Sequence, residues 1–436
     1  MPTRPMGITI IQKSTPRTRK LNPKLALVLA GGAVTGGAFK LGGLAALDDF
    51  LVTHKVVDFD IYVGLSAGAL LAAPLAAGVP PSELIETLDG HDDLGEFRLQ
   101  DFYRPNLGEI VSKPIDFITD LATYVPGAIA EMLRKSPTTW RRLQEPLRAC
   151  VEAPSGDSLQ LLVAELVRGL QTTRSFPFVL NYLPSGAFDN RGLESFLRRG
   201  FAARGVTNNF RALYRERGKE LYVVAVNLDT AERVVFGHDE DSALTISESV
   251  QASTALPGFY KPARIKGVDY IDGAVRRTVN IDVAIEHGAD LVIAYNPFRP
   301  FNNERLPGAT RGQRGSPLAD HGLFAVVNQV FRALLHSRLH IGLNQYRDDP
   351  SFQGDIILIE PTDSDETFFQ MFPLDFWARR RAAEHGYLSV AGSIEAHHDT
   401  IQTILRRYGI QMNPAPTREG IERIREARPS PNAARA

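Results

Sequence analysis

Cysteine is almost absent from this sequence of 436 residues, in which Cys150 is the sole example. A single cysteine excludes an intrachain disulfide and any metal site built from several thiolates. Proteins of reducing compartments have this composition, so we expect a cytoplasmic protein.

Long hydrophobic runs are also missing. No stretch reaches the ~18 consecutive apolar residues that a membrane-spanning helix requires. The longest apolar segment, residues 67–79, is interrupted by Gly68, Pro74 and Gly78. The N-terminus lacks the apolar core of a secretory signal. These absences predict a soluble protein whose contact with a membrane is at most peripheral.

Charge of one sign is not in excess, because 49 Lys and Arg residues face 50 Asp and Glu residues. The net charge therefore favours neither a nucleic acid nor a membrane as partner. Locally, the first 20 residues contain five basic residues and no acidic one. We predict disordered tails at 1–22 and 413–436, with an electrostatic tether to anionic lipid as the alternative role of the first.

The chain is longer than a usual single core and allows one large domain or two. Residues 24–30 (KLALVLA) form a continuous apolar run that predicts a buried parallel strand. We expect a glycine turn at 31–37, a helix at 38–51 and a second strand at 59–64, followed by a helix that begins at Ser66. Two successive strand–helix units predict an α/β fold with a mainly parallel sheet and helices on both faces.

The remaining segments are assigned from the same patterns. Helical signals dominate an expected insertion at about 92–186, including 115–133 and 158–170. Strand signals return at 220–228, 233–237, 269–271, 290–295 and 355–359. We predict a catalytic domain over 23–300, with residues 301–412 packed on the same domain.

The segment Gly64-Leu65-Ser66-Ala67-Gly68 matches the pattern G-x-S-x-G. A serine on a sharp turn from strand to helix is strained, so the residues two positions before and after it must be small. The turn places Ser66 at the positive end of the following helix, where an oxyanion is stabilised. The pattern alone also suits an ordinary turn of small residues, so it indicates a nucleophile only in company with other signals.

The glycine segment 31–37 (GGAVTGG) follows the first expected strand. A phosphate-binding P-loop would need Gly-Lys-Ser/Thr at its end, but Ala38 and Phe39 follow Gly37. A dinucleotide site would need G-x-G-x-x-G, which the segment lacks. An oxyanion hole requires only backbone N–H groups, and it is therefore the function with which this glycine-rich sequence is most compatible.

Asp272 lies in the segment Tyr270-Ile271-Asp272-Gly273-Ala274 at the end of a predicted strand. By itself an Asp-Gly pair indicates an ordinary turn. Together with the glycine turn and the serine, it is expected to meet the others at the carboxyl edge of a parallel sheet.

In this order of motifs the chain resembles the patatin-like phospholipases over roughly residues 25–300. Further stretches resemble the same family: Phe188-Asp189-Asn190, Ala252 to Phe259 (ASTALPGF), Asn280-Ile281-Asp282 and Gly288 to Ala294 (GADLVIA). The glycine segment departs from the family pattern G-G-G-x-[R/K]-G, because Ala33 takes the third glycine position and Thr35 the basic one. Lys40 is a candidate for the missing positive charge, although we expect its side chain to face solvent.

The resemblance implies a three-layer patatin-like fold and a catalytic pair of Ser66 and Asp272 without histidine. It also implies that backbone amides hold the oxyanion, with five candidates: Gly31, Gly32, Ala33, Val34 and Ala67. A free carboxylate is a weak base, with a pKa of ~3.9 against ~6.5 for imidazole. Burial would raise the pKa of Asp272 and make proton transfer easier.

The α/β-hydrolases share G-x-S-x-G but need a histidine after the acid. Seven histidines follow Asp272, namely His287, His321, His336, His340, His385, His397 and His398. Position argues against that fold, because several strand–helix units precede its nucleophile and Ser66 follows the second recognisable strand. His287, His336 and His340 are expected to be structural, and we expect no metal or cofactor.

These features predict a serine hydrolase of lipid carboxylic esters that works through an acyl-enzyme. Two alternatives stay open: an acyltransferase on the same residues, and a lipid-binding protein without catalysis. The expected partner is a lipid or acyl ester and not a nucleic acid, and the sequence does not indicate an oligomeric state. Two apolar stretches, 118–133 and 368–377, are expected to belong to the core, with membrane contact as the alternative.

Overall fold

The computed structural model describes residues 7–15, 19–88, 99–120, 137–152, 182–302, 317–362 and 365–416, together with residues 420 and 422. The chain divides into two compact units. One consists of Met1–Arg104 and Phe188–Ala436, and the other of Pro105–Ala187.

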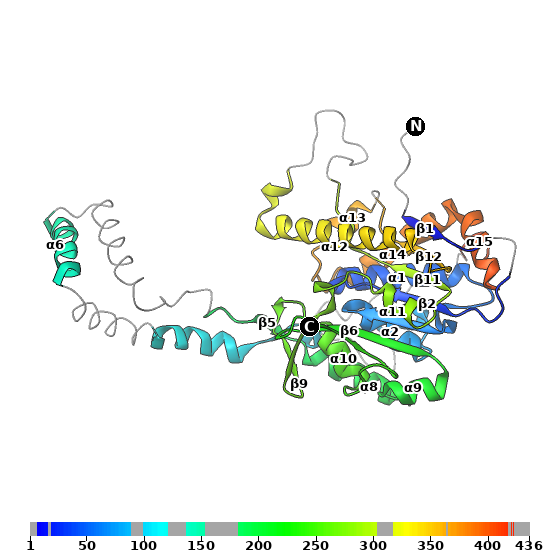
Figure 1. Cartoon of the computed structure of the whole chain (residues 1–436), viewed down its shortest axis with the longest axis horizontal. Helices are drawn as coiled ribbons and strands as arrows, with labels where there is room; N and C mark the ends of the chain where they lie inside the picture. Colours follow the sequence, from blue (N-terminus) through cyan, green and yellow to red (C-terminus); the bar gives the residue numbers. More distant parts are fainter. Residues whose placement is uncertain are drawn as a thin grey trace. The chain divides into compact units, whose positions relative to one another are not determined.

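A nine-stranded sheet is the centre of the larger unit (Figure 1). Its strands are β1 (Ile8–Gln12), β2 (Leu25–Leu29), β3 (Ile61–Leu65), β6 (Glu220–Asn227), β7 (Arg233–Phe236), β9 (Ala263–Ile265), β10 (Val268–Asp272), β11 (Leu291–Tyr295) and β12 (Asp355–Ile359). Their order is β1-β12-β11-β2-β3-β6-β10-β9, with β7 also paired to β6. The five strands from β12 to β6 are parallel, and the strands outside them are antiparallel. The predicted α/β fold with a largely parallel sheet is confirmed.

The larger unit contains most of the helices. They are α1 (Ala33–Phe50), α2 (Ala67–Ala76), α3 (Pro81–Thr87), α4 (Leu99–Phe102), α8 (Arg191–Ala203), α9 (Phe210–Arg217), α10 (Ile246–Ser253), α11 (Ile281–Glu286), α12 (Leu323–Asp348), α13 (Glu366–Gln370), α14 (Arg379–Ala396) and α15 (His398–Arg407). Short 3₁₀ turns are η1 (Val56–Asp58), η3 (Gly273–Val275) and η4 (Leu318–His321). Three further short strands are β4 (Arg104–Pro105), β5 (Gly186–Asp189) and β8 (Gly258–Tyr260).

The core lies on both faces of the sheet because parallel strands are buried on both sides. In β2, Leu25 and Leu27 face a cluster that includes side chains of α1, α2, α14 and α15. Their neighbours Ala26 and Val28 face a second cluster, to which α11 and α12 contribute. The alternation of two buried faces explains why residues 24–30 read as a continuous apolar run rather than an alternating one.

Strand β1 lies in the segment 1–22 that we predicted to be a disordered tail, and for residues 8–12 this prediction is wrong. Ile8 and Ile11 are buried, and the strand pairs antiparallel with β12 from Ile8↔Ile359 to Gln12↔Asp355. The basic residues dominated the sequence reading, whereas the short run Ile-Thr-Ile-Ile provides enough apolar surface to complete an edge of the sheet.

Helices α1 and α14 cross in backbone contact. A Cβ atom at Gly42 would lie 1.8 Å from the carbonyl oxygen of Ala383, and one at Gly386 would lie 1.9 Å from that of Phe39. Both positions therefore require glycine, because any side chain would push the helices apart. This crossing fixes α1, which begins directly after Gly31 and Gly32, to residues more than three hundred positions later in the chain.

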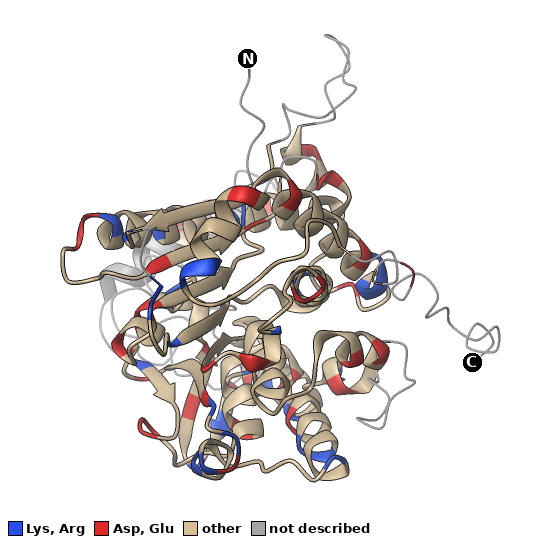
Figure 2. Cartoon of the chain, turned by 90° about the vertical axis from the view of Figure 1, so that its right-hand side faces the viewer, with Lys and Arg blue, Asp and Glu red and all other residues tan. Residues whose placement is uncertain are grey.

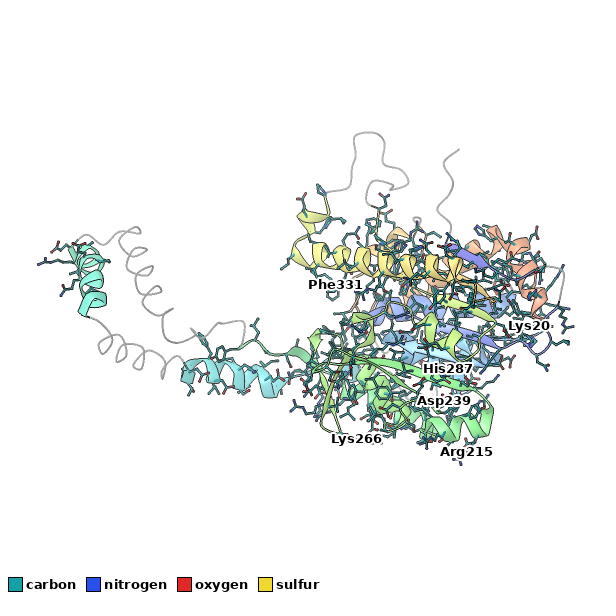
Figure 3. All side chains as sticks on the ribbon, in the orientation of Figure 1. Lys20, Arg215, Asp239, Lys266, His287 and Phe331 are labelled. Atoms are coloured by element: carbon teal, nitrogen blue, oxygen red, sulfur yellow. The ribbon has the colours of Figure 1, made fainter. Side chains whose placement is uncertain are left out.

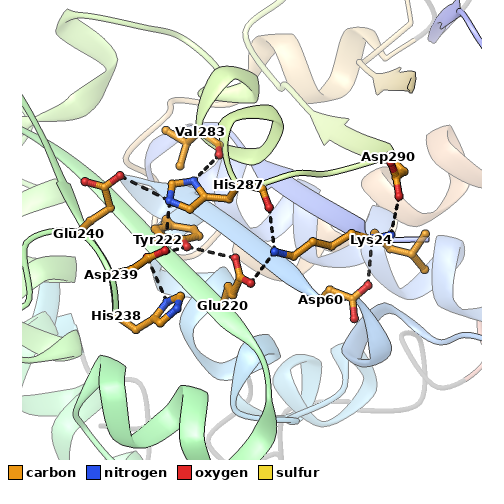
Figure 4. Close-up of polar contacts among 11 residues, drawn as sticks. Lys24, Asp60, Glu220, Tyr222, His238, Asp239, Glu240, Val283, His287 and Asp290 are labelled. Carbon is orange, nitrogen blue, oxygen red and sulfur yellow. Dashed lines mark hydrogen bonds and ion pairs between the residues drawn. The ribbon is translucent and has the colours of Figure 1, made fainter. Parts of the chain in front are cut away.

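Polar side chains join the amino ends of the parallel strands (Figure 4). Lys24, just before β2, forms an ion pair with Glu220 at the start of β6, at 2.6 Å. Its ammonium also donates to the carbonyl of His287 at 2.8 Å. His287 follows α11, contacts Asp239 and stacks near Tyr222. This network lies at the amino ends of the parallel strands, whereas Ser66 follows the carboxyl end of β3. This position fits the structural role expected for His287.

The smaller unit is described over residues 105–120, 137–152 and 182–187. Residues 107–120 are helical, and α6 spans Pro137–Glu152. Glu109 accepts a hydrogen bond from the backbone of Ser185 at 2.7 Å, and the hydroxyl of Tyr182 donates to Asp120 at 2.7 Å. The helices expected at 121–133 and 158–170 lie outside the described residues.

Charges are mixed over the described elements (Figure 2). Basic and acidic residues are scattered over the ribbon and do not gather in one region of it. Among the described helices, none combines the length and the apolar composition that crossing a membrane would require.

Candidate active site

Ser66 is the single residue between β3 and α2, and its backbone is strained. Its φ of 55° and ψ of −129° are unusual for a side chain larger than glycine. The neighbours must be small: a Cβ atom at Gly64 would lie 2.5 Å from the Cα of Ala69, and one at Gly68 would lie 2.2 Å from the carbonyl oxygen of Leu29. The predicted context of a strand before Ser66 and a helix after it is therefore present.

Ser253 holds the backbone of this turn. Its hydroxyl accepts a hydrogen bond from the Ser66 N–H at 2.7 Å and donates one to the carbonyl of Val224 at 2.6 Å. Ser253 is fully buried at the end of α10. Sequence reasoning used this serine as part of a family-like segment but did not assign it a role, and its partner on β6 could not be read from the chain.

Asp272 is brought to Ser66 by strand pairing. Residue Asp272 is opposite Ala225 on β6, and Val224 is opposite Leu65 on β3. The two side chains therefore come from next-but-one strands at the same level. We expected Asp272 at the carboxyl edge of a parallel sheet, but β10 runs antiparallel to β6 and reaches the site from the other direction.

The carboxyl group of Asp272 is 2% exposed, and burial raises its pKa to about 6. Three interactions oppose this rise because they favour the charged form: a hydrogen bond from the Ser66 hydroxyl, one from the N–H of Ala274 at 2.9 Å, and the positive charge of Lys40. A carboxyl group in this range is mostly ionised at pH 7 and is a stronger base than one in water.

Lys40 is fully buried, so the expectation that it faces solvent is wrong. Helix α1 begins at Ala33 rather than at residue 38, and side chains lean towards the start of their helix. The ammonium therefore reaches back to the end of β2, where it donates to the carbonyls of Ala30 and Gly31, the latter at 2.7 Å. Burial lowers the pKa of Lys40 to about 7, and the charge of Asp272 opposes that shift.

The glycine turn is shorter than predicted and consists of Gly31 and Gly32 before α1. Gly32 has a φ of 152° and Ala33 a φ of 52°, which turn the chain sharply into the helix. The amides of Val34 and Thr35 both donate to the carbonyl of Pro373, each at 3.0 Å. Within the described part of the chain, the amides of Gly31, Gly32 and Ala33 donate to no protein acceptor.

Two residues of the predicted oxyanion set, Gly31 and Ala67, lie close to Ser66. Ala67 follows it directly, and a Cβ atom at Gly31 would lie 3.3 Å from the Cβ of Ser66. Gly273 packs against β6, since a Cβ atom there would lie 2.6 Å from the carbonyl oxygen of Val224. The residues of the predicted site therefore lie at the ends of β2, β3 and β10 and at the beginnings of the helical segments that follow these strands.

A cavity lined mainly by apolar side chains opens beside Ser66. Its lining includes Ala33, Val34, Leu70, Leu71, Phe102, Leu193, Phe196, Leu197, Leu256 and Leu374. These residues come from α1, α2, α4, α8 and two loops, all within the larger unit. Among the described residues, one His and carboxylate group has metal-ligand spacing, and it lies outside this lining on α12 and after β12.

Sequence similarity links the chain to a known family and to a known protein. The family model described as patatin-like phospholipase matches residues 27–285. The chain is 22% identical over 278 residues to "Probable lipid hydrolase 463L" of Invertebrate iridescent virus 6, which covers 62% of this chain and 68% of that protein.

Two solved structures are similar at low identity. VipD from Legionella pneumophila is 17% identical, with a TM-score of 0.34 and coverage of 91% of this chain and 71% of VipD. Human GIVD cytosolic phospholipase A2, solved with methyl gamma-linolenyl fluorophosphonate, is 11% identical, with a TM-score of 0.31 and coverage of 88% of this chain and 59% of the human one. The family model covers more than half of the sequence, and the chain belongs to the patatin-like phospholipase family.

Proposed function

We propose that the chain hydrolyses carboxylic esters of lipids, with Ser66 as nucleophile and Asp272 as general base. The observation that carries this proposal is the buried pair of Ser66 and Asp272 beside an apolar cavity. Membership of the family makes a lipid hydrolase the general expectation. The roles of the two residues and the ester substrate are the specific part of the proposal.

The reaction begins when Asp272 accepts the proton of the Ser66 hydroxyl and the oxygen attacks the ester carbonyl. The tetrahedral intermediate expels the alcohol, which takes the proton from Asp272. Water then gives a proton to Asp272 and attacks the acyl-enzyme. The second tetrahedral intermediate releases the fatty acid as the Ser66 oxygen takes this proton back from Asp272, which regenerates both residues. The raised pKa of Asp272 helps in both directions, because its acid form also protonates the leaving group.

The oxyanion is held by backbone N–H groups of the turns after β2 and β3. Gly31, Gly32 and Ala33 provide amides without a protein acceptor in the described chain, and Ala67 adds the amide at the start of α2. Val34 is the weakest of the five predicted donors, because its N–H is already bonded to Pro373. Lys40 positions the turn after β2, because its ammonium donates hydrogen bonds to the carbonyls of Ala30 and Gly31.

Labelling with a fluorophosphonate probe tests this function. A fluorophosphonate reacts with an activated serine and mimics the tetrahedral intermediate. We expect the probe to modify the full-length protein at Ser66, as located by mass spectrometry of peptides, and to leave folded Ser66→Ala unmodified. Absence of labelling at Ser66 would contradict the proposal and support a lipid-binding protein without catalysis.

A transferase would form the same acyl-enzyme and would also be labelled. The two activities are separated by the fate of the acyl group when an alcohol such as glycerol is added. We expect free fatty acid to stay the main product. Transfer to glycerol as the main product would replace hydrolysis by acyl transfer on the same residues.

The proposed membrane contact is located on α12 rather than on the two stretches named from the sequence. Residues of one face of this helix are exposed: Leu323, Phe324, Val327, Val330, Phe331 and Leu334. The opposite face buries Leu335, Leu339 and Leu343. Phe331 is labelled on α12 in Figure 3. In the stretch 368–377, Phe368, Phe369 and Phe376 belong to the core as expected, whereas Phe372 and Trp377 are exposed. In the stretch 118–133, residues 121–133 lie outside the described residues.

The apolar face of α12 contacts a segment that lines part of the cavity. Phe324 contacts Phe372, with ring centroids 4.6 Å apart, and Leu374 two residues later lines the cavity. A lipid surface touching this face would therefore present acyl chains close to Ser66.

Vesicle flotation measures this contact. We expect full-length protein to float with phosphatidylcholine vesicles and the double variant Phe331→Asp, Leu334→Asp to stay in the soluble fraction. Leu228→Asp, at an exposed position after β6, is the matched control and is expected to float like the unmodified protein. Flotation that is equal in all three proteins would exclude α12 as the contact surface.

A further inference from the structure

Three side chains with metal-ligating atoms meet beside α12. His336 and His340 are one helical turn apart, with ring centroids separated by 4.2 Å. Glu360 directly follows β12. Its Oε1 lies 3.7 Å from Nε2 of His336 and its Oε2 lies 3.2 Å from Nε2 of His340. The potential ligand atoms all lie within 4.8 Å of one another.

The fold brings these residues together because α12 packs against β1, which pairs with the strand that Glu360 follows. Leu339 and Leu343 bury one side of the helix against the sheet, and the two histidines lie at the border of that buried side. Both histidines are partly exposed, whereas Glu360 is 5% exposed. The sequence shows the two histidines four positions apart, but the carboxylate comes from a segment that only the sheet places next to them.

Glu360 is held in one orientation by groups that are not histidines. The side-chain amide of Asn296, which is fully buried, donates to Oε1 at 2.8 Å. The backbone N–H of Glu360 donates to the carbonyl of Gly7 at 2.8 Å. A carboxylate fixed in this way by a second polar residue is typical of metal sites. The 3.7 Å separation from His336 is too long for a hydrogen bond, so this imidazole faces the carboxylate without bonding to it.

We propose that His336, His340 and Glu360 bind a divalent transition-metal ion of the zinc type. Two imidazoles and one carboxylate form a donor set that Zn²⁺ accepts, with water at the remaining position. Bonds of about 2.0–2.1 Å at tetrahedral angles place ligand atoms about 3.3 Å apart. The separations of 3.2 Å and 3.7 Å are close to that value. The guanidinium of Arg299 is the nearby positive charge that opposes binding.

Such an ion would tie α12 to the turn beside Ser66. Asn296 continues into Pro297 and Phe298, and these two side chains contact the glycine turn: a Cβ atom at Gly32 would lie 2.9 Å from Pro297, and one at Gly31 would lie 3.2 Å from Phe298. The ion is therefore a structural one that stabilises the wall of the site and takes no part in the reaction. Its binding does not depend on the proposed ester hydrolysis.

Metal titration of the EDTA-treated full-length protein tests the site. Isothermal titration with Zn²⁺ is expected to give one equivalent, and Co²⁺ is expected to produce the visible absorption of a low-symmetry complex. Glu360→Gln keeps the size of the side chain and an oxygen for Asn296 but removes the charged ligand. We expect it, and the double variant His336→Gln, His340→Gln, to weaken Zn²⁺ binding at least about 100-fold. Zn²⁺ should raise the Tm of the unmodified protein and not that of Glu360→Gln.

The matched control is His397→Gln, His398→Gln, which removes two imidazoles elsewhere and is expected to leave the titration unchanged. Circular dichroism without metal establishes that each variant is folded. If Zn²⁺ binds Glu360→Gln as tightly as the unmodified protein, the two histidines are an ordinary surface chelate and the proposal fails. It also fails if the unmodified protein binds no stoichiometric equivalent.

Discussion

Replacing Ser66 with alanine is expected to lower kcat/KM for a long-chain p-nitrophenyl ester by a factor on the order of 10⁴ or more, because the nucleophile is lost. Asp272→Asn should lower it by about 10² to 10⁴, since an amide cannot accept the proton of Ser66. The double variant should be no slower than Ser66→Ala, because the two residues act in one step. Steady-state assays of the purified variants measure all three effects.

Asp269→Asn is the matched control for Asp272→Asn. It makes the same chemical change on the same strand, at a partly buried residue that forms an ion pair with the exposed Arg264 at 2.5 Å. We expect its activity to equal that of the unmodified protein. A folded Asp272→Asn variant that keeps the rate of Asp269→Asn would show that Asp272 is not the base.

Lys40→Met is expected to change the pH dependence as well as the rate. Asp272 works as a carboxylate, so kcat/KM of the unmodified protein should be present above its pKa and fall as the pH drops through about 6. The positive charge of Lys40 lowers that pKa, and its removal should move the acidic limb to higher pH. The turn at Gly31 also loses its hydrogen bond from the ammonium, which is expected to reduce kcat by about 10² through misplacement of the oxyanion donors.

The alkaline side of the profile provides a second readout. Lys40 has a pKa of about 7, so its charge is lost as the pH rises through that value. The kcat/KM of the unmodified protein should decline as the pH rises through about 7, and Lys40→Met should not show this decline. Lys20→Met is the matched control, because it removes a charge from an exposed pair with Asp290. An unchanged profile in folded Lys40→Met would mean that Lys40 only fills space.

The parallel strands could be predicted from sequence because each one is a short apolar run that is buried on both faces. Strands β2, β6, β11 and β12 lie within one or two residues of their predicted bounds. Edge strands were harder, since an edge is only partly buried and carries a weaker signal. For the same reason β1, with five residues, was hidden among the basic residues of the first segment.

The turns of the proposed active site could be predicted where local sterics restrict the residue type. Ser66 needs glycine two positions away on both sides, and that requirement is visible in the chain. Ser253 and Pro373 act through contacts with distant segments, whereas Lys40 contacts the nearby end of β2. Nothing local distinguishes a buried lysine from an exposed one, and the start of α1 at Ala33 decided its direction.

The family match ends at residue 285, but later residues hold the glycine turn and α1 in place. Pro373 accepts the hydrogen bonds of Val34 and Thr35, and α14 meets α1 at Gly42 with no room for a side chain. A fragment limited to the matched segment would therefore keep both Ser66 and Asp272 but lose the contacts that Pro373 and α14 make with the beginning of α1 and with Gly42. A fragment that keeps these contacts therefore has to include α14 at least as far as Gly386.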